Sequence, residues 1–159
     1  MIRVGHGYDV HPFRAGRRLV LGGVLVPSPR GGLAGHSDAD VLAHAVASAL
    51  LGSLALGDLG THFPDTDPRW QDASSLDLLQ AVRSLVRERG WKVVNCDATV
   101  IAQEPRLALH VSSMRANLAR ALDVGLDDVS VKPTTHEGLG ALGRAEGIAA
   151  HAVVVIGRA

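Results

Sequence analysis

Apolar residues recur along the chain with the two periods that distinguish strands from helices. Residues 2–10 and 18–26 are rich in β-branched side chains and predict two neighbouring strands joined by a short turn. Residues 91–103 predict a strand whose core-facing side consists of Val94, Cys96, Ala98, Val100 and Ala102. Residues 128–135 and 148–157 supply the last two predicted strands.

The first helix is predicted where the spacing of apolar residues becomes helical, after Ser37. Ser37 followed by Asp40 resembles a capping box, and an apolar stripe follows, made by Val41, Leu42, Ala45, Val46, Ala49 and Leu50. Gly52 is expected to end this helix. Residues 54–72 combine Gly, Pro and Asp without periodicity, which predicts a long loop of the kind that often carries function.

Two further helices are predicted in the second half of the chain. One begins at Ser74 or Ser75 and ends at Gly90. The other has Pro105 in its first turn and runs to about Leu122. Two strands, two helices, a strand, a helix and two strands in this order predict an α+β fold. We expect a single mixed β-sheet with helices packed on one face.

The amino-acid composition limits the classes of molecule that the protein is expected to bind. The 159 residues suit one domain, residues 1–159, with an aliphatic core, because 47% are hydrophobic and only 3% aromatic. Sixteen basic residues balance sixteen acidic ones without forming a stripe, so a small molecule is expected rather than nucleic acid or a membrane. No apolar run is long enough to cross a bilayer. A single cysteine, Cys96, and no signal-peptide profile lead us to expect a cytoplasmic protein with an inert buried thiol.

The stretch GHGYDVH, residues 5–11, brings an acid and an imidazole close together. In an extended strand Asp9 and His11 point to the same face. His44 follows Asp40 by four residues and shares its helix face. Asp9, His11 and His44 together offer one carboxylate and two imidazoles, a donor set for Zn²⁺ with an open fourth position. On local spacing alone, ordinary polar residues at element ends are the simpler interpretation.

Two loops offer further polar groups. The first, within residues 54–72, contains the carboxylates Asp58, Asp65 and Asp67. They could bind Mg²⁺, accept hydrogen bonds from substrate hydroxyls, or only make turns. The second, KPTTHEGLGALGRAEG at 132–147, adds threonine hydroxyls, free backbone amides, Glu137 and Arg144, a set that suits a diphosphate with Mg²⁺. Glycine-rich turns also occur without any ligand, and neither phosphate-binding fingerprint is present.

Taken in order, these blocks resemble the 2-C-methyl-D-erythritol 2,4-cyclodiphosphate synthase family of the non-mevalonate isoprenoid pathway. The matching stretches cover essentially the whole chain: GHGYDVH, LGG, HSDADVLAHA, ALLG, GDLG, HFPDTDP, VIAQEPRL, VKPTTHEGLG and GRAEGIAAHAVV. Several blocks in the right order are far more specific than one motif. The resemblance implies a lyase that cyclises 4-diphosphocytidyl-2-C-methyl-D-erythritol 2-phosphate and releases CMP. The 2-phosphate of the substrate would be the nucleophile.

The resemblance also implies roles for individual residues. Asp9, His11 and His44 would bind Zn²⁺, and Glu137 would hold Mg²⁺ or Mn²⁺ between the phosphates. His36 and Thr135 would stabilise the transition state, with Ser37 beside the phosphates. The methylerythritol pocket maps to Asp58, Leu59, Gly60, Phe63, Pro64, Asp65, Thr66 and Asp67. The cytidine pocket maps to Ala102, Gln103, Glu104, Pro105, Arg106, Leu107, Ala108 and Thr134. The remaining substrate-binding positions are Val10, His136, Ala141 and Arg144.

The family is a homotrimer with active sites between subunits, so the resemblance implies that one chain supplies the metal and sugar side and the next the cytidine side. Ala141 departs from the usual Phe, near an axial cavity that binds isoprenoid diphosphates in some members. Arg106 replaces a common Lys with a planar fork. Two other hypotheses are open: a metal-dependent phosphodiesterase or nucleotide hydrolase that uses water, and a non-catalytic trimer that binds an isoprenoid diphosphate.

Overall fold

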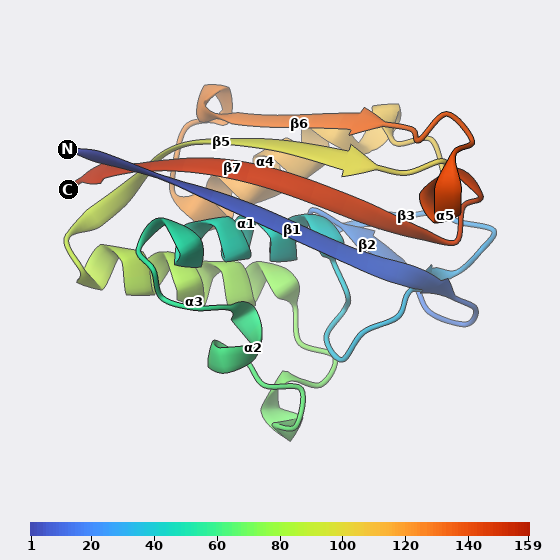
Figure 1. Cartoon of the computed structure of the whole chain (residues 1–159), viewed down its shortest axis with the longest axis horizontal. Helices are drawn as coiled ribbons and strands as arrows, with labels where there is room; N and C mark the ends of the chain where they lie inside the picture. Colours follow the sequence, from blue (N-terminus) through green and yellow to red (C-terminus); the bar gives the residue numbers. More distant parts are fainter.

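The computed structural model describes residues 1–159 and has a five-stranded sheet with helices on one face (Figure 1). Its strands are β1 (Ile2–Arg14), β4 (Gly32–Leu33), β5 (Trp91–Ile101), β6 (Val129–Thr134) and β7 (Gly147–Arg158), in the spatial order β4-β1-β7-β5-β6. Strands β5 and β6 are parallel and the other neighbours antiparallel. The predicted α+β fold with one mixed main sheet is therefore confirmed.

Three longer helices cover the sheet: α1 (Val41–Ser53), α3 (Ser75–Glu88) and α4 (Val111–Leu122). Helix α1 packs on β1 and β7, α3 packs on α1 and α4, and α4 also contacts β6. The short helix α5 (Gly140–Gly143) lies at the end of the sheet opposite both termini (Figure 1). The segment after α1 holds α2 (Leu59–His62) and a 3-10 turn at Pro68–Trp70. No helix has the length and apolar character needed to span a bilayer.

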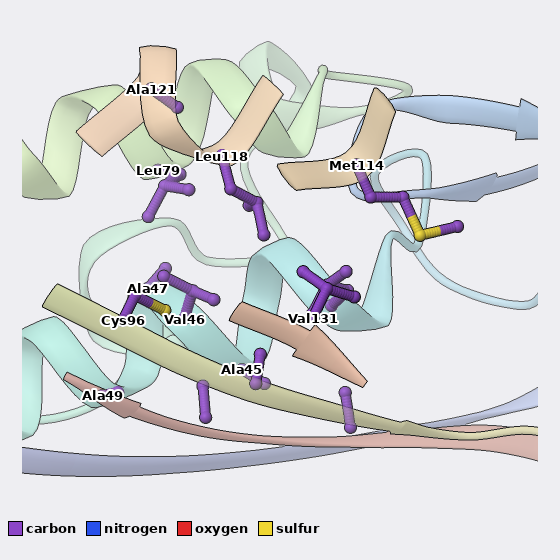
Figure 2. Close-up of a cluster of buried hydrophobic side chains, with 14 of the residues drawn as sticks. Ala45, Val46, Ala47, Ala49, Leu79, Cys96, Met114, Leu118, Ala121 and Val131 are labelled. Carbon is purple, nitrogen blue, oxygen red and sulfur yellow. The ribbon is translucent and has the colours of Figure 1, made fainter. Parts of the chain in front are cut away.

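The core fills the space between the sheet and the three longer helices. Figure 2 shows side chains of α1, α3 and α4 meeting those of β5 and β6, among them Val46, Leu79, Leu118 and Val131. Cys96 lies within this cluster, and burial raises the pKa of its thiol to about 12. The expectation of an inert buried cysteine is therefore confirmed.

Glycines in β1 let helix α1 lie directly on the strand backbone. A Cβ at Gly5 would come within 1.8 Å of the Ala49 carbonyl oxygen, and one at Gly7 within 1.9 Å of the Ala45 oxygen. Both distances are far below van der Waals contact, so any side chain at these positions would push the helix away. The close approach places His44, the neighbour of Ala45, beside the part of β1 that carries Asp9.

The prediction of one strand at 18–26 beside the first strand is wrong. These residues form a separate two-stranded sheet of β2 (Leu19–Leu21) and β3 (Val24–Val26). Gly22 and Gly23 turn the chain between them with φ of +55° and +69°, a conformation that glycine adopts at little cost. Their amides donate to the Asp40 carboxylate at 2.9 and 2.7 Å, a contact 17 or 18 residues away in sequence.

Two predicted helix starts also differ from the structure. The residue that caps α1 is Asp40 itself, whose carboxylate accepts from Ala43 N at 3.0 Å, whereas Ser37 precedes the helix. Helix α4 begins at Val111 rather than at Pro105, because the residues before it form a loop and a 3-10 turn at Ala108–His110.

The prediction that Val94 shares the core face of Cys96 is also wrong. A β-bulge between Val93 and Asn95 shifts the register of β5 against β7. Val93 is therefore 8% exposed and Val94 is 43% exposed.

Candidate active site

Asp9 lies at the centre of the cluster predicted from the sequence. Strand β1 extends through residue 14, so Asp9 and His11 share the face that α1 covers, and α1 presents His44 to them. The Asp9 Oδ2 atom lies 2.9 Å from His11 Nε2 and 3.1 Å from His44 Nδ1. One potential ligand atom from each residue lies within 4.8 Å of the other two. The structure therefore brings together the three residues that the sequence suggested as metal ligands.

The cluster is electrostatically biased towards an ionised carboxylate. Burial alone would raise the pKa of Asp9, but the two histidines outweigh it and hold the pKa well below its usual range. Burial likewise tends to lower the pKa of His11, yet the neighbouring Asp9 carboxylate raises it above 6.5. A charged oxygen is therefore available between two imidazoles.

The polar atoms of the cluster fit a metal ion. His11 Nε2 is buried and makes no well-aligned hydrogen bond, although it lies close to Asp9. A buried imidazole nitrogen without such a partner loses solvation, and coordination of a cation would restore the lost interaction. Two imidazoles and one carboxylate are also a common ligand set for a catalytic divalent cation. The cluster can therefore hold a metal ion.

A cavity of about 310 Å³ opens next to this cluster. Its lining joins residues from β1, α1 and the segment that contains α2, and the predicted members are Asp9, His11, His36, Ser37, His44, Asp58, Leu59, Gly60, Phe63 and Asp65. Polar and apolar groups thus face one space of the size that accommodates a small molecule. The structure brings most of the predicted zinc and sugar positions into a single pocket.

Some predicted positions near this cavity do not line it. Pro64, Thr66 and Asp67 are absent from the lining. The Asp67 carboxylate accepts from Arg69 N at 3.0 Å and so caps the turn at Pro68–Trp70. Its carbonyl oxygen lies 3.3 Å from His36 Nε2. The side chain of Val10 points to the opposite face of the sheet from that of Asp9, so only the backbone of Val10 can face the side of the metal-binding residues.

A second cavity, of about 350 Å³, lies at the β6 edge of the sheet. Its lining contains the predicted cytidine positions Ala102, Gln103, Pro105, Arg106, Leu107, Ala108 and Thr134, together with Thr135. The two cavities share no lining residue, and strands β7 and β5 separate β1 from β6. Glu104 does not line this cavity, and its carboxylate forms an ion pair with Arg30.

The remaining predicted residues follow β6. Glu137 is exposed, with φ of +51°, and its carboxylate accepts from Thr135 Oγ1 at 3.1 Å. His136 Nδ1 lies 3.2 Å from the Leu139 carbonyl oxygen. Ala141 lies in α5, and Arg144 Nε donates to Glu146 at 2.7 Å. None of these residues lines the metal cavity, so within one chain Glu137 stands apart from Asp9.

Sequence reasoning missed five residues at the metal cavity and its edge. Ser48, Trp70 and Leu78 complete the lining. Ser75 approaches His44 from the other side, with Ser75 Oγ 2.8 Å from His44 Nε2, and Asp38 accepts from the Ser75 hydroxyl. The sequence contained a signal for Ser75 only as a helix start, because its contact with His44 spans 31 residues. Ser48 follows His44 by four residues and was predictable from helical spacing.

Comparison with known proteins gives matches over nearly the whole chain. The YgbB family matches residues 2–157. The 2-C-methyl-D-erythritol 2,4-cyclodiphosphate synthase of Syntrophomonas wolfei is 58% identical over 158 residues, which is 99% of this chain and 100% of that protein. The enzyme of the same name from Trichlorobacter lovleyi is 56% identical over 155 residues, 98% of each chain.

Solved structures agree in fold. The bifunctional IspDF from Campylobacter jejuni superposes with a TM-score of 0.95 at 42% identity and covers 100% of this chain, which spans 43% of that longer chain. A CDP-bound 2C-methyl-D-erythritol-2,4-cyclodiphosphate synthase gives 0.89 at 37% identity, covering 98% of this chain and 100% of that chain. The IspF–CDP complex from Plasmodium falciparum gives 0.85 at 31% identity, with 99% and 96% covered.

Proposed function

Because the chain belongs to the YgbB family of 2-C-methyl-D-erythritol 2,4-cyclodiphosphate synthases, we propose the family reaction for it. The enzyme converts 4-diphosphocytidyl-2-C-methyl-D-erythritol 2-phosphate into 2-C-methyl-D-erythritol 2,4-cyclodiphosphate and CMP, a step of the non-mevalonate isoprenoid pathway. The observation that carries this assignment is the cluster of Asp9, His11 and His44 in a cavity that Asp58 and Asp65 also line.

The reaction needs no nucleophile from the protein. An oxygen of the 2-phosphate attacks the β-phosphorus, and the bond from that phosphorus to the α-phosphate oxygen breaks. The electron pair of the broken bond leaves with CMP, and water takes no part. The protein therefore acts by holding the two ends of one flexible substrate in line and by neutralising charge, effects that reach about 7–11 kcal/mol in favourable cases.

We assign Zn²⁺ to Asp9, His11 and His44, because two imidazoles and a carboxylate with an open position suit this ion. Bound there, the ion supplies a Lewis acid for a phosphate oxygen. Glu137 is a single exposed carboxylate next to Thr135, which suits Mg²⁺ or Mn²⁺ that takes its other ligands from phosphates and water. The two residues assigned to transition-state charge, His36 and Thr135, lie in the two different cavities.

Substrate recognition divides between the cavities in the same way. Asp58 and Asp65 line the metal cavity, where carboxylates can accept hydrogen bonds from the methylerythritol hydroxyls. Ala102, Gln103 and residues 105–108 line the other cavity, which suits a cytidine. We place Ser37 beside the phosphates, since it borders the metal cluster. His136, Ala141 and Arg144 remain predicted substrate contacts.

We propose a homotrimer whose active sites lie between neighbouring chains. The metal cavity lies at β1 and the second cavity at β6, with β7 and β5 between them, so a substrate that needs both would be held by cavities of two neighbouring chains. The sheet face away from the helices offers a contact surface. We call it the outer face, and its exposed apolar members are Ile2, Val4, Tyr8, Val10, Val94 and Val153. An apolar sheet face without a covering layer is typical of an interface.

Product identity tests the proposed reaction. Purified protein loaded with Zn²⁺ and Mg²⁺ is incubated with the diphosphocytidyl substrate, and the products are followed by phosphorus NMR. We expect two coupled cyclic-diphosphate resonances together with CMP, and their loss in His44→Ala. The matched control is His110→Ala, which removes a histidine that makes no side-chain cap contact at the start of α4. Linear phosphate products would instead indicate a hydrolase.

A further inference from the structure

His44 uses both ring nitrogens, and only one of them faces the metal cluster. Its Nδ1 lies 3.1 Å from Asp9 Oδ2. Its Nε2, on the other side of the ring, lies 2.8 Å from Ser75 Oγ and 3.2 Å from Ser37 Oγ. A neutral imidazole has one N–H and one lone pair, and a metal ion needs the lone pair. The group that fixes the proton on Nε2 therefore decides whether Nδ1 can bind a metal.

Asp38 determines the direction of the hydrogen bond between Ser75 and His44. The Ser75 backbone N–H donates to Asp38 Oδ2 at 3.1 Å, and the Ser75 hydroxyl donates to Asp38 Oδ1 in a short contact. A serine hydroxyl has a single proton, and a carboxylate only accepts. Since that proton points to Asp38, Ser75 Oγ must accept from His44. His44 then carries its proton on Nε2 and presents the Nδ1 lone pair towards Asp9.

The hydrogen bonds of the neighbouring groups are consistent with donation from His44 Nε2 to Ser75 Oγ. Ser37 Oγ accepts from Ala39 N at 3.2 Å and lies 3.5 Å from Ser75 Oγ, so its own proton has an acceptor other than His44. Asp38 Oδ1 also accepts from Asp40 N at 3.1 Å. Ser75 is 1% exposed, so water does not compete for its hydroxyl. Every donor in the chain of contacts has an acceptor.

We propose that Asp38 and Ser75 are positioning residues for the metal centre, which orient His44 and keep Nδ1 free for the ion. This inference rests on the zinc site assigned above. Ser75 is the first residue of α3 and Asp38 precedes α1, so the contact also ties the metal ligand to the packing of two helices. Outer hydrogen-bond partners of metal-bound histidines typically change metal affinity by about 10–100-fold when they are removed.

The test measures zinc affinity by competition with a chelating indicator. Ser75→Ala removes the acceptor for His44 Nε2, and we expect the zinc dissociation constant to rise by about 10–100-fold. Asp38→Asn keeps the size of the side chain but loses one acceptor, and we expect a loss in the same direction. Ser84→Ala is the matched control, because Ser84 is an exposed serine of the same helix that donates to Gln80 O. It should bind zinc like the wild type.

A second measurement separates positioning from a general loss of structure. In the zinc-loaded wild type, NMR should detect a slowly exchanging proton on His44 Nε2, and in Ser75→Ala that proton should exchange rapidly. Wild-type zinc affinity in both folded variants would overturn the proposal, as would a rapidly exchanging Nε2 proton in the wild type. A rapidly exchanging proton in the wild type would refute the proposal even if neither variant folds. A wild type that binds no zinc would instead refute the zinc assignment itself.

Discussion

Asp9 and His11 form a pair whose proton equilibria bear directly on metal binding. The Asp9 carboxylate raises the pKa of His11 above 6.5 against the opposing effect of burial. In the metal-free protein His11 therefore contributes stability that is complete below 6.5 and is lost as the pH rises through its raised pKa. A metal ion competes with that proton for the same nitrogen.

We therefore predict that zinc affinity rises with pH through a window that lies above 6.5, the ordinary value for histidine. The measurement is a series of zinc competition titrations across that range, with the unfolding of the metal-free protein recorded at each pH. The free energy of unfolding of the metal-free protein should fall slightly over the same window. Zinc affinity that is already constant at and above pH 6.5 would contradict the raised pKa of His11.

Helix α1 and strand β1 meet without intervening side chains, and this contact fixes where His44 lies. Gly7→Ala would force a Cβ against the Ala45 carbonyl oxygen. Overpacking of this kind costs about 1–3 kcal/mol, and here the helix backbone that carries His44 must move. We predict a lower thermal midpoint and a weaker zinc affinity for Gly7→Ala.

Gly52 provides the control within the same helix. A Cβ at Gly52 would meet only the His6 carbonyl oxygen, at 3.7 Å, which is ordinary contact. Gly52→Ala should therefore leave zinc affinity unchanged and stabilise α1 by about 1 kcal/mol, the difference in helix propensity between the two residues. Equal effects of the two substitutions on zinc binding would show that the close approach of α1 to β1 does not position His44.

Local spacing predicted the parts of the site that depend on one element. Asp9 and His11 share a face because β1 is extended, and His44 follows from the spacing along α1. The hairpin of β2 and β3 was missed although its signal is local, because Gly22 and Gly23 between two apolar runs are typical of a tight β-turn. The contact of Ser75 with His44 was missed because it joins residues 31 positions apart. Contacts between distant segments leave no periodic signal in the sequence.

The resemblance to the synthase family identified site residues that the spacing of residue types along the chain could not identify. Asp58, Leu59, Gly60 and Phe63 lie in a segment with no periodic pattern, yet they line the metal cavity. In the second cavity, the lining residues between Ala102 and Leu107 likewise lie in an irregular segment around Pro105, whereas Thr134 ends β6. Spacing also predicted the core face of β5 correctly only beyond its bulge, since Val94 lies outside the core and Cys96 within it. A bulge is a local insertion that alternation alone does not reveal.

At the scale of the whole molecule, the outer face of the sheet is the surface through which we propose that the chains of the trimer contact one another. Val153 lies on this face, 41% exposed, in a row with His6 and Asp97 on the neighbouring strands. We predict that Val153→Asp shifts the mass measured by sedimentation from that of a trimer towards that of one chain, because a buried unpaired charge opposes association. Leu126→Asp is the control, since Leu126 is 49% exposed outside the sheet. A Val153→Asp protein that keeps the wild-type mass would exclude the outer face as the interface.

Complementation between two inactive variants tests the shared active site most directly. His44→Ala disables the metal cavity, and Thr135→Ala disables the second cavity, which lies beside β6. The two chains are co-expressed with different affinity tags, and assemblies that carry both tags are purified and assayed for CMP release. A trimer that contains both variants has one site built from two intact halves, so we predict about one third of the wild-type activity. Doubly tagged assemblies as inactive as either variant alone would contradict an active site formed between neighbouring chains.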